Sequence, residues 1–123
     1  MLPNGVYFCT IKQHNGDNDK STSLDREDVF RLAIGLNPEN YARMFGGKPT
    51  RPVKGGVVAT EYDYTELNEL MPHPIYAWIS WVQILSPGRD KFREIFPLIQ
   101  EAHQEAVKRF RSKTASIHFA AEQ

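Results

Sequence analysis

A histidine enclosed by two prolines is the residue with the clearest potential for chemistry. His73 lies between Pro72 and Pro74, so its backbone is pushed towards extended conformations and either X-Pro bond could be cis. An imidazole held rigidly in this way suits a general base or a metal ligand. The simpler interpretation is a hydrogen-bonded corner residue between a helix that ends at Pro72 and a strand that starts at Pro74. No cysteine or carboxylate lies at ligand spacing from it.

Arg31 is the second candidate, because it stands in the middle of an apolar segment typical of a strand. Burying an unpaired guanidinium is costly, so a partner is expected. Its fork of N–H donors could hold a carboxylate or phosphate group of a ligand. Equally, it could pair with Asp25, Asp28 or Glu61, or face solvent on a one-sided sheet.

An aromatic cluster is the third candidate. Tyr76, Trp78 and Trp81 lie close together, with Tyr62 and Tyr64 nearby in the sequence. Such side chains are most often part of a core. Trp78 and Trp81 would lie on opposite faces of a strand, so one of them could be exposed and serve an interface or stack on a ligand.

The segment 46–56 has the glycines and cations of an anion-binding loop. It does not match a phosphate-binding P-loop, because Ala42 stands where the first glycine should be and Pro49 replaces the serine or threonine. A solvated connection is favoured. No serine elbow or Ser/His/Asp arrangement is present, and we expect no metal ion and no cofactor.

Composition bounds the class of protein. A chain of 123 residues with 41% apolar and 24% charged residues is typical of one globular domain. Lysine plus arginine equals aspartate plus glutamate at 15 each, which argues against a protein that wraps duplex nucleic acid. Cys9 is the single cysteine, so an intrachain disulfide is excluded. Without a leader or an apolar run of roughly 18 residues, the sequence predicts a cytoplasmic location.

Hydrophobic periodicity predicts a two-layer α+β fold with an antiparallel sheet of three to four strands and helices packed on one face. Strands are expected at residues 5–13, 29–36, 75–85 and, as a short piece, 57–60; helices are expected at 38–45, 65–71 and from about 89 to 111. Alternation puts Leu32 and Ile34 on one face of the second strand and Arg31 and Ala33 on the other. Pro97 predicts a kink, or two helices that meet there. We expect a single domain of residues 1–113 and a C-terminal tail of residues 114–123.

Five blocks in a fixed order resemble a bacterial family of unknown function, DUF family 6194, from about Phe8 to Val107. The blocks are Leu24-Asp25-Arg26, Val29-Phe30-Arg31-Leu32 with Ile34-Gly35, Tyr62-Asp63-Tyr64-Thr65, Leu70-Met71-Pro72-His73-Pro74-Ile75-Tyr76, and Trp81 with Leu85-Ser86-Pro87. That family is distantly similar to YjbR/MmcQ-like proteins, which have a two-layer α+β fold. The resemblance implies no established activity, substrate or catalytic residue.

The start of the chain predicts a homodimer. Relatives in that family have an extra helix and strands before the block that begins here at Tyr7, so a sheet edge or an apolar face would be uncovered. Proteins normally hide such edges, and a second copy could pair or bury them. Ile117 and Phe119 in the tail could dock on the partner chain.

Three functions remain open. The favoured one is a non-catalytic module that binds a small ligand or a protein partner through the sheet face. Its candidate ligand-binding residues are Arg31, His73, Tyr76, Trp78 and Trp81. The alternative is a small enzyme with His73 as general base and Arg31 as anion holder, which requires both side chains to open into one pocket. Nucleic-acid binding, suggested by the basic end of the last helix, is less favoured because the net charge is zero. We expect no membrane association.

Overall fold

The computed structural model describes the backbone of residues 8–122 and the side chains of residues 8–111. Its elements are β1 (Cys9–Lys12), β2 (Arg31–Gly35), α1 (Pro38–Phe45), β3 (Met71–Pro72), the 3-10 helix η2 (Ala77–Ile79), β4 (Trp81–Leu85) and α2 (Arg89–Glu122). The strands form one sheet in the order β1-β2-β4-β3, and each neighbouring pair is antiparallel. The predicted two-layer α+β fold is confirmed.

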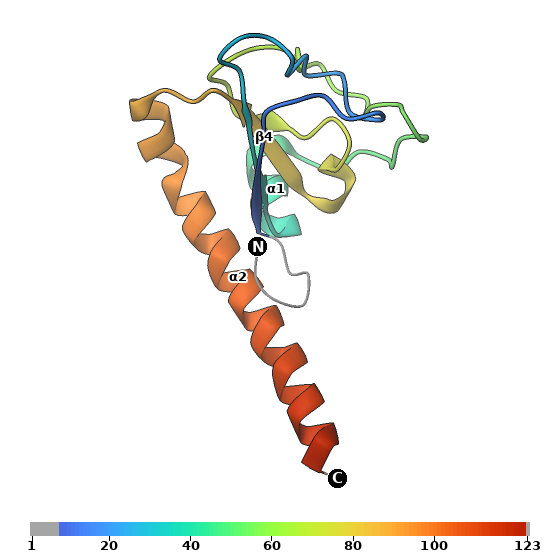
Figure 1. Ribbon diagram of the computed structural model, residues 1–123, viewed down its shortest axis with the longest axis vertical. Helices are drawn as coiled ribbons and strands as arrows, with labels where there is room; N and C mark the ends of the chain where they lie inside the picture. The colour runs from blue at the N-terminus through green and yellow to red at the C-terminus, as the bar shows by residue number, and fades with distance from the viewer. Residues whose placement is uncertain (1–7, 123) are drawn as a thin grey trace.

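Helix α2 supplies the second layer. It runs diagonally along the sheet, and its C-terminal half continues past the strands (Figure 1). Its buried Ile95 and Ala102 share one core cluster with Leu32 and Ile34 of β2. Burial of each large apolar side chain stabilises the fold by about 2 kcal/mol. No helix in the described part of the chain combines the length and apolarity needed to cross a membrane.

The helix is continuous through Pro97, so two separate helices do not form there. At 34 residues its length is about 50 Å. Residues 114–122, predicted as a tail, continue the same helix. Ile117 and Phe119 lie outside the residues whose side chains are described, and their docking on a partner stays a prediction.

Helix α1 begins and ends at the residues that the sequence predicts. The side-chain oxygen of Asn37 accepts a hydrogen bond from the amide of Asn40 at 2.7 Å, and Pro38 follows Asn37 as the first helical residue. Gly46 ends the helix with a φ of 84°, a conformation that glycine adopts without steric cost. The predicted boundaries are therefore confirmed.

Three local predictions are wrong. Residues 65–71 do not form a helix, because the carboxylate of Asp63 accepts hydrogen bonds from the amide and hydroxyl of Thr65 and closes a turn instead. Residues 57–60 form no strand, although the amide of Val58 donates to the carbonyl of Pro74. The strand expected at 75–85 is shortened by η2, after which Ser80 adopts a φ of 72° and leads the chain into β4.

Candidate ligand-binding site

The face of the sheet opposite α2 carries a pocket. Arg31, Ala33 and Gly35 lie on this face, as the alternation along β2 predicts. A pocket of about 250 Å³ opens here, and we call it the sheet pocket. It is lined by Thr10, Arg31, His73, Tyr76, Ile79 and Trp81.

A glycine lets one wall of the sheet pocket lie close to the strands. Gly35 pairs with Trp81 across β2 and β4. A Cβ atom added to Gly35 would stand 2.8 Å from Cε2 of the indole, well inside van der Waals contact. The indole of Trp81 therefore lies directly against the backbone of β2.

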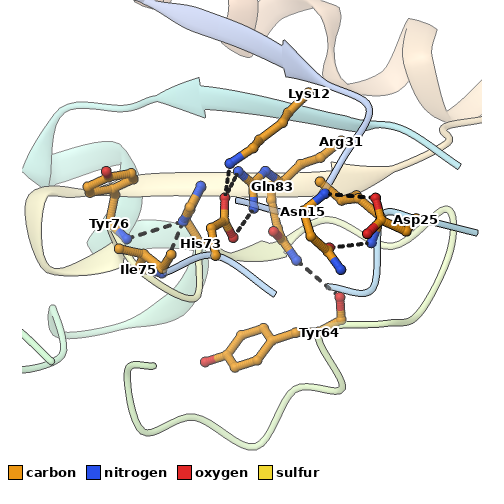
Figure 2. A network of polar contacts seen from close by, with 11 residues as sticks. Lys12, Asn15, Asp25, Arg31, Tyr64, His73, Ile75, Tyr76 and Gln83 are labelled. Atoms are coloured by element: carbon orange, nitrogen blue, oxygen red, sulfur yellow. Dashed lines mark hydrogen bonds and ion pairs between the residues drawn. The ribbon is translucent and has the colours of Figure 1, made fainter. Parts of the chain in front are cut away.

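His73 caps the turn that leads into η2. Its Nδ1 accepts hydrogen bonds from the amides of Ile75 at 3.1 Å and Tyr76 at 3.2 Å, and Pro74 occupies the first position of the turn. This is the arrangement of a helix N-cap followed by proline, built here with an imidazole. Figure 2 shows Nδ1 turned to these two amides while the second ring nitrogen points away from the turn.

The capping bonds fix the protonation state of His73. An Nδ1 that accepts from two amides leaves the single proton on Nε2. Burial, together with the nearby charge of Arg31, lowers the pKa of His73 from 6.5 to about 3. The ring is neutral at neutral pH, and its Nε2–H is a donor without a hydrogen-bond partner among the described residues.

This geometry argues against His73 as a general base. A base needs a free lone pair and a pKa near the working pH. Here the lone pair of Nδ1 is occupied, Nε2 carries the proton, and the side chain is only 2% exposed. The imidazole can donate a hydrogen bond to a bound molecule, but it is poorly placed to remove a proton from one.

Arg31 is held by a buried ion pair. Its Nη1 donates to Oδ1 of Asp19 at 2.9 Å, and its Nη2 donates to Oδ2 of the same carboxylate. Lys12 donates to Oδ2 of Asp19 at 2.9 Å. Burial alone would raise the pKa of Asp19, but hydrogen bonds and charges from Arg31 and Lys12 outweigh it and lower the pKa to about 2. The three groups together carry one positive charge.

One N–H donor of the Arg31 guanidinium group has no partner among the described residues. Arg31 is 4% exposed, and its Nε is buried without a hydrogen-bond partner among the residues that the structure describes. Buried donors of this kind are uncommon and often mark a site for a water or a ligand. Arg31 therefore lines the sheet pocket as a cation whose terminal nitrogens are neutralised and whose inner nitrogen is not.

The acidic residues that were predicted to pair with Arg31 are not its partners. The sequence offered Asp25, Asp28 and Glu61, whereas the counter-ion is Asp19. Reciprocal backbone hydrogen bonds of 3.1 and 3.2 Å between Gly16 and Asp19 close the loop that carries this carboxylate over the sheet. Asp25 instead accepts from the amide of Asn15. Nothing in the local sequence separates Asp19 from the other acidic residues of the same polar loop.

The structure brings together four of the five candidate ligand-binding residues. Arg31, His73, Tyr76 and Trp81 all line the sheet pocket, and the rings of His73 and Tyr76 are 5.0 Å apart. Trp78 belongs to η2 and lines a different cavity. Sequence reasoning missed Ile79 and Thr10, because one was assigned to a strand interior and the other lacked a distinctive signal.

No group of three or more His, Cys, Asp or Glu side chains within the described residues is arranged to hold a metal ion. The residues that line the sheet pocket carry the N–H groups of Arg31, His73 and Trp81, the hydroxyls of Thr10 and Tyr76, and an aromatic wall.

Residues 1–115 match the model of a family of unknown function, DUF6194. The chain belongs to this family. The resemblance of the five sequence blocks is thereby confirmed. No curated protein and no solved structure matches the chain. Family membership brings no activity with it, so the function has to be argued from the site.

Replacing Asp19 tests the buried ion pair. Asp19→Asn removes the counter-charge and leaves a buried guanidinium uncompensated, so the free energy of unfolding should fall by about 3–5 kcal/mol. Lys12→Met should cost less than about 1 kcal/mol, because the side chain of Lys12 is 36% exposed and Arg31 still compensates the charge of Asp19. The double variant Asp19→Asn/Arg31→Met should recover part of the loss. Urea unfolding measures all three, and equal small losses in Asp19→Asn and Lys12→Met would contradict the assignment.

The low pKa of His73 predicts that the folded protein loses stability in mild acid. The unfolded chain binds a proton at His73 with a pKa near 6.5, and the folded chain does so only near 3. The unfolded state therefore gains protons first, and stability falls as the pH drops from 6.5 towards 3. Between pH 7 and 4 the loss from this group should be about 3 kcal/mol.

His73→Asn is the matched control for this pH dependence. An asparagine oxygen can accept from the amides of Ile75 and Tyr76 but does not titrate. Urea unfolding at several pH values should show a flatter profile for His73→Asn than for the unmodified chain above pH 4, since the stability contributed by Asp19 is lost mainly between its unfolded pKa of 3.8 and its folded pKa of about 2. An identical slope in both proteins would rule out a buried neutral imidazole.

Proposed function

We propose that this protein is a non-catalytic module that binds a small molecule in the sheet pocket. The observation that carries the proposal is the Nε2–H of His73, a neutral and unpartnered donor on a side chain 2% exposed that lines the pocket. Arg31 lies in the same lining with its own unpartnered Nε. A few polar groups among aromatic and aliphatic walls are the usual composition of a small-molecule site.

The lining defines the kind of molecule. Tyr76, Ile79 and Trp81 offer apolar and aromatic surface, while the buried polar groups offer donors only. The ligand should therefore have a largely apolar body with one acceptor oxygen. A pocket of about 250 Å³ exceeds the cavity of about 150 Å³ that holds benzene. A single ring with a small acceptor substituent fits this space.

A binding function is favoured over the enzyme alternative because His73 is arranged to donate a hydrogen bond rather than to remove a proton. The match to the family supports a shared fold and leaves the activity open. The bacterial origin and the distant relation to YjbR/MmcQ-like proteins stay predictions.

The module is proposed to act as a homodimer. In the described part of the chain β1 forms one edge of the sheet, and Ile11 on this strand is 69% exposed. An open strand edge tends to pair with another chain. Antiparallel pairing of two β1 edges about a two-fold axis is self-complementary, and the zero net charge of the chain gives no long-range repulsion between copies.

Acetophenone and ethylbenzene test the pocket, since they share a ring and differ in the carbonyl acceptor. The chain has two tryptophans, so its ¹H–¹⁵N spectrum contains two indole N–H signals that Trp78→Phe and Trp81→Phe assign. Acetophenone should shift the Trp81 signal and bind more tightly than ethylbenzene. His73→Asn should weaken acetophenone binding by about threefold to tenfold and leave ethylbenzene unchanged.

A second variant guards against misfolding as the cause. Thr10→Tyr should fill the rim of the sheet pocket and abolish both shifts, whereas Thr10→Val, which keeps the volume, should preserve them. If neither compound shifts Trp81, or if His73→Asn still prefers acetophenone to the same degree, the proposal fails.

The oligomeric state is measured by light scattering at tens of micromolar. We expect a dimer for the unmodified chain and a monomer for Ile11→Lys, because lysine on an edge strand opposes pairing. Val53→Lys, at a loop residue 81% exposed, adds the same charge away from β1 and should remain dimeric. A monomeric mass for the unmodified chain would contradict the proposal.

A further inference from the structure

A second cavity adjoins the sheet pocket. It has a volume of about 340 Å³ and lies between the segment 51–56 and the turn that leads into η2. We call it the loop pocket. Its lining includes Asn18, Arg51, Lys54, Tyr76 and Trp78. These cations belong to the segment 46–56, which was expected to be a solvated connection, and they do not line the sheet pocket.

The loop that forms this pocket has a defined shape. The amide of Gly56 donates to the carbonyl of Val53 at 2.8 Å, and Gly55 has a φ of 80°. The amide of Val58 donates to the carbonyl of Pro74 at 2.8 Å, which ties the end of the loop to the corner beside His73. The backbone that carries the two cations is therefore tied to the corner beside the sheet pocket.

The loop pocket is positively charged. Arg51 and Lys54 contribute two cations, and no acidic side chain is in the lining. Neither cation forms an ion pair with an acidic side chain in the described part of the chain. The guanidinium carbon of Arg51 lies 4.7 Å from the ring centre of Trp78. Stacking on the indole holds the guanidinium plane in place and leaves its N–H edges free for an anion.

Tyr76 is shared by the two cavities. It lines both of them, and it is 47% exposed. The sheet pocket alone is smaller than the range of about 300–1,000 Å³ usual for small-molecule sites, and the two cavities together fall inside that range. Tyr76 therefore stands at the boundary between the two cavities.

We infer that the two pockets form one site for an aryl-alkyl anion, whose ring occupies the sheet pocket with its acceptor substituent towards His73 and whose anionic group is held by Arg51 and Lys54. This inference rests on the proposed function and specifies its ligand class. The ring meets Trp81 and Ile79, the spacer passes Tyr76, and the anion meets the only two cationic side chains in the lining of the loop pocket. The anion is bound by the loop and not by Arg31, whose terminal nitrogens are already paired with Asp19.

The test compares 4-phenylbutyrate with its uncharged analogue 4-phenylbutan-1-ol and with the shorter benzoate. Each tryptophan reports on one cavity, Trp81 on the sheet pocket and Trp78 on the loop pocket. 4-Phenylbutyrate should shift both indole N–H signals, and 4-phenylbutan-1-ol should shift that of Trp81 alone. 4-Phenylbutyrate should bind about tenfold more tightly than the alcohol or benzoate, as expected for a charge-assisted contact.

Variants of the loop cations distinguish a failure of this inference from a failure of the proposed function. Arg51→Gln/Lys54→Gln should reduce the affinity for 4-phenylbutyrate to that of the alcohol and leave the alcohol itself unchanged. Lys48→Gln, in the same loop but outside the lining, should have no such effect.

If the alcohol shifts Trp81 but the double variant binds 4-phenylbutyrate as tightly as before, this inference fails and the proposed function stands. If no compound shifts Trp81, both fail. Benzoate binding as tightly as 4-phenylbutyrate would place the anion beside Arg31 and overturn the inference.

Discussion

The buried pair of Arg31 and Asp19 is the interaction on which the rest of the site depends. A guanidinium on the face of the sheet opposite α2 requires a counter-charge close by, because an uncompensated ion in this position would cost several kcal/mol. Asp19 satisfies this requirement only when its loop folds over the end of the sheet. The positive charge of Arg31 in turn helps to keep the neighbouring His73 neutral. The ion pair thus explains why the loop closes, whereas burial is the main reason that the imidazole stays neutral.

His73 has two roles that do not compete, because its two nitrogens are used separately. Nδ1 caps the turn before η2 and is fully engaged within the chain. Nε2 lies on the other side of the ring and is left for whatever enters the pocket. The prolines on both sides reinforce this division, since they limit the backbone conformations from which the ring could adopt another orientation. A residue that is explained as a structural corner is therefore also a defined hydrogen-bond donor.

Local rules predicted the parts of the fold that local interactions decide. Asn37 and Pro38 specify α1 through a cap and a preset φ, and the alternation along β2 correctly placed Arg31 opposite the face that packs on α2. The partner of Arg31 could not be predicted, because the choice among several acidic residues depends on how a polar loop closes in three dimensions. The segment 65–71 was misassigned for a related reason. Its last residue, Met71, pairs with Gln83 of β4, and a long-range ladder overrides a weak helical tendency.

The closeness of Gly35 to the indole of Trp81 has a consequence for how this pocket can change over evolution. The ring lies where a methyl group on Gly35 would be, so the smallest possible substitution at this position would push the wall of the pocket outwards. Such a change would leave every polar group of the site untouched. Different residues therefore determine the size of the ligand and the recognition of its acceptor atom. The absence of a side chain at Gly35 sets how large a ligand the pocket accepts.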